Sequence, residues 1–432
     1  MKNLKSKILK IQLKCLIFII ALYISLSTNS YAQSGWFTQN SGCNNYLYSV
    51  YLIDANTGFV SGRDGTILKT TNGGDSWLSQ TSGTTCSLVS VFFSNANTGT
   101  IVGFSTQGYN GIILRTTNSG NNWVTQVNGF SKAISSVYFK NVNTGIAVGE
   151  NGIILRTTDG GENWNKFDSP TQKWLVCVNF SDLIYGAASG LFGAIIRTTN
   201  GGLNWFLQNS GIDKNLHSIY FINKDTGTAV GSPGQIIKTL NGGLNWSPQT
   251  SPVPFSLRSV FFVNENTGYI AGHGGLIMKT TNGGEVWNIQ TIGVYSPLKS
   301  IFFINADTGF TVGEYGTILK TVTGGTIGIK KISSEVPEDF HLHQNYPNPF
   351  NPVTTIEYAI PKKSDVTITV YNIIGQVVDV LVDQTMEPGY YSVQWDARRV
   401  GSGVYFYRIM AGDPSSGSGH GFTDVKKCII LK

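Results

Sequence analysis

The chain has 432 residues, of which 51 are glycine, 12% are aromatic and only 13% are charged, a composition that favours an all-β protein with many turns. Five lysines and no acidic residue lie in the first 32 residues, so the formal charge of +6 falls to +1 in the rest, where 26 basic residues face 25 acidic ones. A nearly neutral chain gives no electrostatic basis for nucleic-acid binding.

Residues 1–32 have the pattern of a secretory signal peptide. A lysine-rich start precedes the apolar run Cys15–Leu26, and Ser30–Ala32 offers a cleavage site with small residues at both ends. The run has 12 residues, too short to cross a bilayer, and no other stretch is long and apolar enough to do so. Cys15 opens the run instead of following it, so it is not placed as a lipoprotein cysteine would be.

After the signal peptide, the chain repeats a pattern of four short strands. In the first repeat we expect strands at Leu47–Leu52, Thr57–Gly62, Gly65–Thr70 and Trp77–Ser82, separated by glycine and asparagine. Seven second strands of this kind can be found along the chain. Four short strands per period are typical of a β-propeller blade.

An eight-residue motif joins the third and fourth strands of each repeat. It reads TTNGGDSW at Thr70–Trp77, and its closing tryptophans recur every 41 residues with one interval of 46, the period of propeller blades. Its polar third residue and glycines suit a tight turn. The polar residues are Asn72, Asn118, Asp159, Asn200, Asn241 and Asn282, and the tryptophans are Trp77, Trp123, Trp164, Trp205, Trp246 and Trp287. The pattern S/T-x-D/N-x-G-x-x-W resembles the Asp-box (BNR) repeat, and we interpret it as structural.

The two ends of the repeat array complement each other. The seventh motif, Thr321–Gly328, lacks its tryptophan, while Gly35–Gln39 has the sequence of a fourth strand with no blade before it. Closure of the ring by this N-terminal strand would place Trp36 in the missing position and would leave no exposed strand edge. We therefore predict a seven-bladed β-propeller over residues 33–330.

The repeat unit as a whole (S-V-x-F, N-T-G, G-x-I-x-K/R-T, T-x-G-G-x-x-W) resembles the photosystem II stability/assembly factor family of propellers over about 290 residues. The resemblance implies a non-enzymatic scaffold that holds an assembling membrane protein. A basic residue precedes every motif: Lys69, Arg115, Arg156, Arg197, Lys238, Lys279 and Lys320. This basic ring could bind an acidic partner, or each stem could lie on apolar surface with its charge in water.

The turns between second and third strands differ from blade to blade. If the first strand is innermost, these turns share one face of the propeller with the inter-blade connections. The candidate binding residues on this face are Arg63, Asp64, Tyr109, Glu150, Asn151, Phe192, His273, Glu314 and Tyr315. A rigid repeat with variable turns on one face suggests a recognition surface. Drift in unselected loops is the alternative.

Beyond the repeats, we expect a linker at residues 331–344 and a small immunoglobulin-like β-sandwich at residues 345–432. The motifs NYPNPFNPVTTIEYAIP, VYNIIGQVV, GSGVYFYRI and KKCIILK resemble the type A sorting domain of type IX secretion. The resemblance implies Sec export, recognition by the type IX machinery, and a final location outside a Gram-negative cell or on its outer-membrane surface. The loose segment Gly412–Gly421 departs from the pattern, and a purely structural sandwich is the alternative.

Four cysteines follow the signal peptide: Cys43, Cys86, Cys177 and Cys428. Cys43 and Cys86 lie in equivalent inter-blade connections, so a disulfide between them is conceivable in an exported protein. The cysteine spacing does not fit a zinc site, and we expect neither a metal nor a cofactor.

Asp boxes also occur in sialidases and other glycoside hydrolases, so an enzyme is the alternative function. Such chemistry needs an arginine cluster or a pair of converging carboxylates. Asp64, Glu150 and Glu314 could converge, whereas many other acidic residues, such as Asp159, Asp225 and Asp307, occupy repeat positions. The propeller arginines are Arg63, Arg115, Arg156, Arg197 and Arg258, three of them in the basic ring. With no catalytic residue assigned, we expect a secreted, non-enzymatic scaffold that binds a protein or a glycan.

Overall fold

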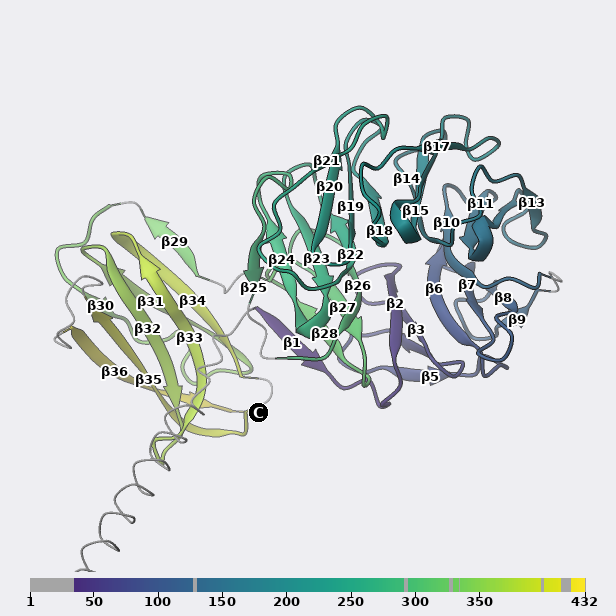
Figure 1. The fold of residues 1–432 in the computed structure, drawn as a ribbon. Helices are drawn as coiled ribbons and strands as arrows, with labels where there is room; N and C mark the ends of the chain where they lie inside the picture. Colours follow the sequence, from purple (N-terminus) through teal and green to yellow (C-terminus); the bar gives the residue numbers. More distant parts are fainter. Residues whose placement is uncertain are drawn as a thin grey trace, which may run out of the picture. The chain divides into compact units, whose positions relative to one another are not determined.

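A computed structural model describes residues 35–126, 130–290, 294–325, 329–333, 335–397, 400–412 and 421–431. The expected signal peptide lies outside these ranges. The described residues form two compact units, one reaching residue 325 and the other beginning at Ile329 (Figure 1). No helix in the described ranges is long and apolar enough to cross a membrane.

The first unit is a β-propeller, whose described residues form seven four-stranded antiparallel sheets. The first blade consists of β2 (Leu47–Leu52), β3 (Gly58–Gly62), β4 (Ile67–Thr70) and β5 (Leu78–Gln80). The second and third blades are β6 (Ser87–Phe93), β7 (Gly99–Phe104), β8 (Gly111–Thr116), β9 (Val124–Thr125), then β10 (Ile134–Phe139), β11 (Gly145–Gly149), β12 (Ile154–Thr157) and β13 (Asn165–Phe167).

The fourth to sixth blades repeat this order. They are β14 (Leu175–Phe180), β15 (Gly186–Gly190), β16 (Ile195–Thr198), β17 (Phe206–Gln208), then β18 (Leu216–Phe221), β19 (Gly227–Gly231), β20 (Gln235–Thr239), β21 (Ser247–Pro248), and β22 (Leu257–Phe262), β23 (Gly268–Gly272), β24 (Ile277–Thr280), β25 (Asn288–Gln290). Short 3₁₀ turns, η1 (Glu150–Gly152), η2 (Leu191–Gly193) and η3 (His273–Gly275), follow the second strands of blades three, four and six.

The seventh blade confirms the predicted closure of the ring. It contains β26 (Leu298–Phe303), β27 (Gly309–Gly313), β28 (Ile318–Thr321) and the N-terminal β1 (Trp36–Gln39), which pairs antiparallel with β28. The Trp36 ring stands edge-on to Phe303 at 5.8 Å, as Trp164 does to Phe139 at 5.8 Å in blade three. The N-terminal strand therefore supplies the tryptophan that the seventh box lacks.

The first strand of each blade is innermost and contacts the first strands of its neighbours (Figure 1). A serine on this strand accepts a hydrogen bond from the backbone N–H of the next blade, as Ser49 does from Val91 at 3.3 Å. The other serine acceptors are Ser90, Ser136, Ser218, Ser259 and Ser300. In blade four the position is Cys177, whose thiol donates to the Ile219 carbonyl oxygen. Buried aliphatic and aromatic clusters between blades complete the core.

The second unit has two four-stranded sheets, as the sandwich prediction requires. One sheet is ordered β29 (Lys330–Ser333), β34 (Gly389–Asp396), β31 (Val353–Ile360), β30 (His341–Leu342), and the other β33 (Val377–Met386), β32 (Ser364–Tyr371), β35 (Gly403–Gly412), β36 (Phe422–Ile430). Trp395, Tyr358 and Tyr407 are fully buried in it. Residues 413–420, most of the expected insertion, lie outside the described ranges, and Ala411 and Phe422 pair beside them.

Two expectations about connections need correction. The segment 331–344, expected to be a linker, contributes parts of β29 and all of β30, because these strands pair with β34 and β31. The conceivable disulfide does not form, since Cys43 and Cys86 are both free. Cys86 accepts a backbone hydrogen bond from Gly65 of blade one, while Gly316 of blade seven lies against the Cys43 carbonyl. Each cysteine is therefore held in a different joint between blades.

Candidate functional site

The propeller has two faces, which we name by their turns. On the box face, each box meets the turn between first and second strands, as where Gly73 N–H donates to the Asn56 carbonyl at 2.8 Å. On the turn face, each turn between second and third strands meets an inter-blade connection, as where Gly65 N–H donates to the Cys86 carbonyl at 2.8 Å. The two faces thus have the composition that chain direction predicted.

The box is a closed network of hydrogen bonds. In blade one, Thr70 Oγ1 donates to Asn72 Oδ1 at 2.9 Å and accepts from Gly74 N–H at 2.8 Å. In blade three, burial raises the pKa of Asp159, but hydrogen bonds from Asn163, Thr157 and Glu162 outweigh it and lower the pKa to about 2. The first and third side chains of these boxes hydrogen-bond to each other and to the backbone of their own turn, which supports a structural role.

The basic ring lies on the box face and mostly joins neighbouring blades. Lys69, Arg115, Lys238 and Lys279 donate to carbonyl oxygens in the next box, for example Lys238 to Gly283 at 2.7 Å. Lys320 pairs with Asp75 at 3.7 Å. Arg197 lies over the Tyr185 ring, and Arg156 lies over Phe167 while Lys140 bonds the next box in its place. These contacts indicate that most side chains of the basic ring connect neighbouring blades.

The turn face holds side chains in an unusual backbone conformation. Asp64, Tyr109, Asn151, Phe192 and Tyr315 all have φ between 54° and 56°. This left-handed region is unfavourable for residues with a β-carbon, most of all for bulky ones. Phe192 is 61% exposed, Tyr315 63% and Tyr109 50%; the Tyr109 ring stacks on Phe104 and the Tyr315 ring meets Tyr46 edge-on. Strain combined with exposure supports a role outside the fold.

An open cleft of about 560 Å³ lies between blades three and four on the turn face. Its lining residues are Lys132, Glu150, Asn151, Gln172, Lys173, Trp174, Leu191 and Phe192. Tyr109, carried by the insertion of blade two, contacts Trp174 at 6.1 Å between ring centroids. Lys173 Nζ donates to the Phe192 carbonyl at 2.8 Å, which fixes the strained turn. The arrangement combines aromatic rings with amide and charged groups.

The off-pattern carboxylates Asp64, Glu150 and Glu314 each have a cation close by. Glu314 is paired with Lys299 at 2.7 Å, Glu150 lies 3.7 Å from Lys132, and Asp64 lies 3.7 Å from Arg63. Asp64, Glu150 and Glu314 belong to blades one, three and seven. Among the described residues no group of three or more acidic, histidine or cysteine side chains is placed to hold a metal ion.

His273 belongs to a polar cluster that the sequence interpretation missed. Arg258 donates to His273 Nε2 from both Nε (3.1 Å) and Nη2 (2.9 Å), and its Nη1 lies 3.5 Å from His217 Nε2. His217 Nε2 lies 2.8 Å from Ser232 Oγ. The available signal was that His217, Arg258 and Lys299 share one position in the repeat.

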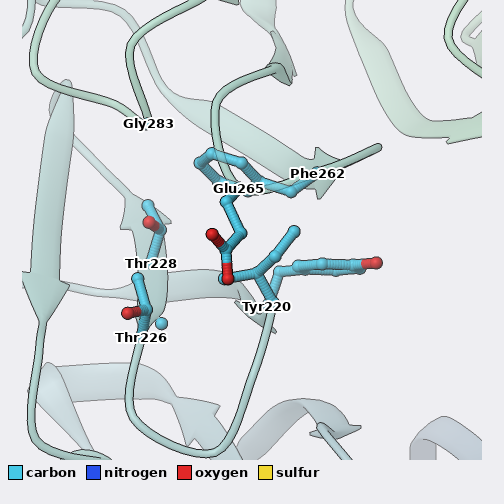
Figure 2. A pocket seen from close by; sticks show the side chains of 8 residues that line it. Tyr220, Thr226, Thr228, Phe262, Glu265 and Gly283 are labelled. Carbon is cyan, nitrogen blue, oxygen red and sulfur yellow. The ribbon is translucent and has the colours of Figure 1, made fainter.

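A small cavity between blades five and six is shown in Figure 2. The side chain of Glu265 lies among Thr226, Thr228 and Tyr220, and Phe262 closes one side. Its volume of about 10 Å³ is enough for a single water at most, so it is a packing feature rather than a ligand site.

The fold defines the chain as a seven-bladed β-propeller followed by a β-sandwich. A family model described as photosynthesis system II assembly factor YCF48 matches residues 28–128 and 197–293. A model described as secretion system C-terminal sorting domain matches residues 344–418. The propeller is thus YCF48-like in its repeats, and the sandwich is a C-terminal sorting domain of type IX secretion, which indicates a secreted propeller.

Solved structures agree with this assignment at the level of fold. A structure of YCF48 bound to D1 peptide shares 22% identity with a TM-score of 0.58, and the match covers 69% of this chain and 99% of that one. YCF48 from Cyanidioschyzon merolae gives 20% identity, a TM-score of 0.57, and 66% and 98% coverage. The WD40 repeats of RRP9 give 11% identity, a TM-score of 0.58, and 68% and 99% coverage. No curated protein matches the chain.

Proposed function

We propose that this protein is a secreted, non-enzymatic scaffold that binds a peptide segment of a partner protein on the turn face of its propeller. The sorting domain carries the propeller through the outer membrane of a Gram-negative cell, to act at the surface or outside it. In this proposal, residues 33–330 bind the partner and residues 345–432 direct secretion.

The observation that carries the proposal is Phe192. Its ring is 61% exposed beside the cleft, and its backbone is held at φ 55°. A bulky residue in this conformation costs about 1–2 kcal/mol, and an exposed ring returns little of that cost through burial. A protein ligand that covers the ring would offset it. The YCF48 structure with a bound peptide supports a peptide as the class of ligand.

The carboxylate contacts support a binding role over hydrolysis. Glycoside hydrolysis needs two carboxyl groups on either side of the scissile bond. Here Glu314 is already paired with Lys299, and Glu150 accepts a hydrogen bond from Ala133 N–H at 3.2 Å. These carboxylates hold the turns of their own blades.

The test is a binding screen with the mature chain, residues 33–432. Peptide and glycan arrays would be probed together, with release of reducing sugar followed in the same samples. We expect capture of a set of peptides without sugar release, and loss of that capture in Phe192→Ser.

The matched control is Leu240→Ser, because Leu240 is 70% exposed on the box face and its replacement removes similar apolar area. It should bind as the wild type does. Sugar release, or equal binding by the Phe192 and Leu240 variants, would contradict the proposal.

A further inference from the structure

The mouth of the central channel on the turn face is built by a repeated β-bulge. In each first strand the pairing register shifts by one residue, as between Leu257 and Ser259 in blade six. The extra residue has no partner in the ladder, and bulges re-aim such side chains. The bulged residues, in blade order, are Tyr48, Val89, Ser135, Val176, His217, Arg258 and Lys299. Three consecutive blades therefore place basic side chains side by side.

Each of these three side chains contacts the turn of its own blade, fifteen residues later. His217 meets the Ser232 hydroxyl, Arg258 meets the His273 imidazole, and Lys299 meets the Glu314 carboxylate. The charge of Lys299 is compensated by Glu314, and their side chains are only 17% and 16% exposed. Arg258, in contrast, has a neutral imidazole where its neighbour has a carboxylate.

Arg258 is thus a half-buried cation without a counter-ion. In the described ranges no carboxylate oxygen lies within 4.0 Å of its guanidinium, the limit for an ion pair. Burial lowers the pKa of Arg258 while the charge of Glu314 raises it, so Glu314 is within electrostatic reach. A guanidinium has five N–H donors, and His273 takes those from Nε and Nη2. One donor on Nη1 faces His217 at 3.5 Å, so the second donor on Nη1 and the second on Nη2 remain for a ligand.

We propose that Arg258, with His217 and His273 beside it, forms a carboxylate-binding subsite at the channel mouth. This inference rests on the proposed binding function and gives the chemistry of one part of the ligand. A planar carboxylate fits a guanidinium through charge-assisted hydrogen bonds, and partial burial strengthens them. The hydroxyls of Ser232 and Ser256, 2.6 Å apart, lie next to His217 as further donors.

Carboxylate binding at this subsite is coupled to proton uptake by His217 and His273. Burial, then Arg258, His273 and Lys299, lowers the pKa of His217 to about 4. Burial, Arg258 and Lys299 also lower the pKa of His273, and Glu314 opposes them. A bound carboxylate offsets the positive charge of Arg258 and so raises both imidazole pKa values. Because the complex then binds more protons than the free protein, affinity increases as the pH falls below neutral.

The test uses NMR of the mature chain, residues 33–432, with ¹⁵N-labelled histidine. The probes are acetate, trialanine as free acid, trialanine amide and glucuronate. We expect acetate and the free acid to raise the pKa of His217 and His273, while the amide leaves both unchanged. His341 and His343 of the sandwich are internal references, since neither should respond.

Variants distinguish the subsite from general charge effects. Arg258→Gln should weaken acetate binding about tenfold or more, the loss of a hydrogen bond to a charged group. Lys214→Gln is the matched control, because it removes a cation from the same face at a side chain 52% exposed. Should Arg258→Gln not fold, His273→Asn provides a second variant. It keeps an acceptor for Arg258 and should bind acetate with a weaker pH dependence.

The subsite is overturned if Arg258→Gln binds acetate as tightly as the wild type does, or if trialanine amide binds as tightly as trialanine free acid. Glucuronate binding through Arg258 would support the carboxylate subsite and identify an acidic sugar as its source. Loss of array peptides in Phe192→Ser but not in Arg258→Gln would overturn the subsite while leaving the proposed function in place. If Phe192→Ser and Arg258→Gln both bind the array peptides as the wild type does, the subsite and the proposed function are both contradicted.

Discussion

On the box face of the propeller, polar side chains close the turn of their own blade or bond to the next blade. On the turn face, the same repeat leaves aromatic rings exposed and a cation without a carboxylate. Thr70 and Asn72 satisfy each other, and Lys238 bonds the next box. Phe192 is instead strained and exposed, and Arg258 lacks a carboxylate. Where the side chains of one face bond within the fold and those of the other face are available to a ligand, recognition is expected on the second face.

The largest expected effect comes from breaking the closure of the ring. Trp36→Ala removes a ring that is 6% exposed and packed against Phe303, so we expect a loss of about 3–5 kcal/mol in the free energy of unfolding of the propeller. Urea unfolding followed by tryptophan fluorescence measures it. Leu244→Ala, at a side chain 57% exposed, is the control and should change little. Unchanged stability of Trp36→Ala would contradict closure through this strand.

Replacing a cation of the basic ring tests whether the box face is structural. Lys238→Met removes the hydrogen bond to the Gly283 carbonyl but keeps the apolar stem, so we expect a loss of about 1.5–3 kcal/mol in stability. Ligand binding should be unchanged. Lys166→Met, at an exposed position of the outer strand β13, serves as control. A binding defect without a stability defect would move recognition to the box face.

Relieving the strain at Phe192 should separate stability from binding. Phe192→Gly places glycine in a left-handed position, as Gly274 occupies at φ 70° in blade six. We expect the propeller to gain up to about 1 kcal/mol in stability, while affinity for the captured peptides falls. Thermal unfolding and peptide titration check the two effects. A variant that loses stability would show that the ring packs usefully in the free protein.

The smallest effect concerns Asp159, the acidic residue at the third position of the box in blade three. The pKa of Asp159 is lowered to about 2 from 3.8, so its contribution to stability is present above about pH 4 and is lost as the pH falls towards 2. Asp159→Asn, which restores the asparagine of the other boxes, removes this dependence. Unfolding of both proteins between pH 7 and about pH 2 should show curves that converge at low pH. Parallel curves would contradict the hydrogen-bonded carboxylate.

Much of the architecture followed from the sequence because its signals are local and repeated. The seven second strands gave the number of blades, the tryptophan interval gave their period, and the missing tryptophan of the seventh box indicated Trp36 as its replacement. Chain direction alone placed the boxes and the variable turns on opposite faces. The motifs of the C-terminal domain indicated its strands and the route of secretion.

Other features depend on contacts between blades, which a single repeat does not encode. The basic ring became a set of inter-blade fasteners because Lys69 and Arg115 reach carbonyl groups of the following box. Part of the expected linker belongs to the sandwich because β30 pairs with β31 at the edge of its sheet. The cluster at the channel mouth needed both the bulge at Arg258 and the neighbouring blade that brings His217 beside it. The sequence determined the repeat unit, and only the closed ring decided which of its side chains meet.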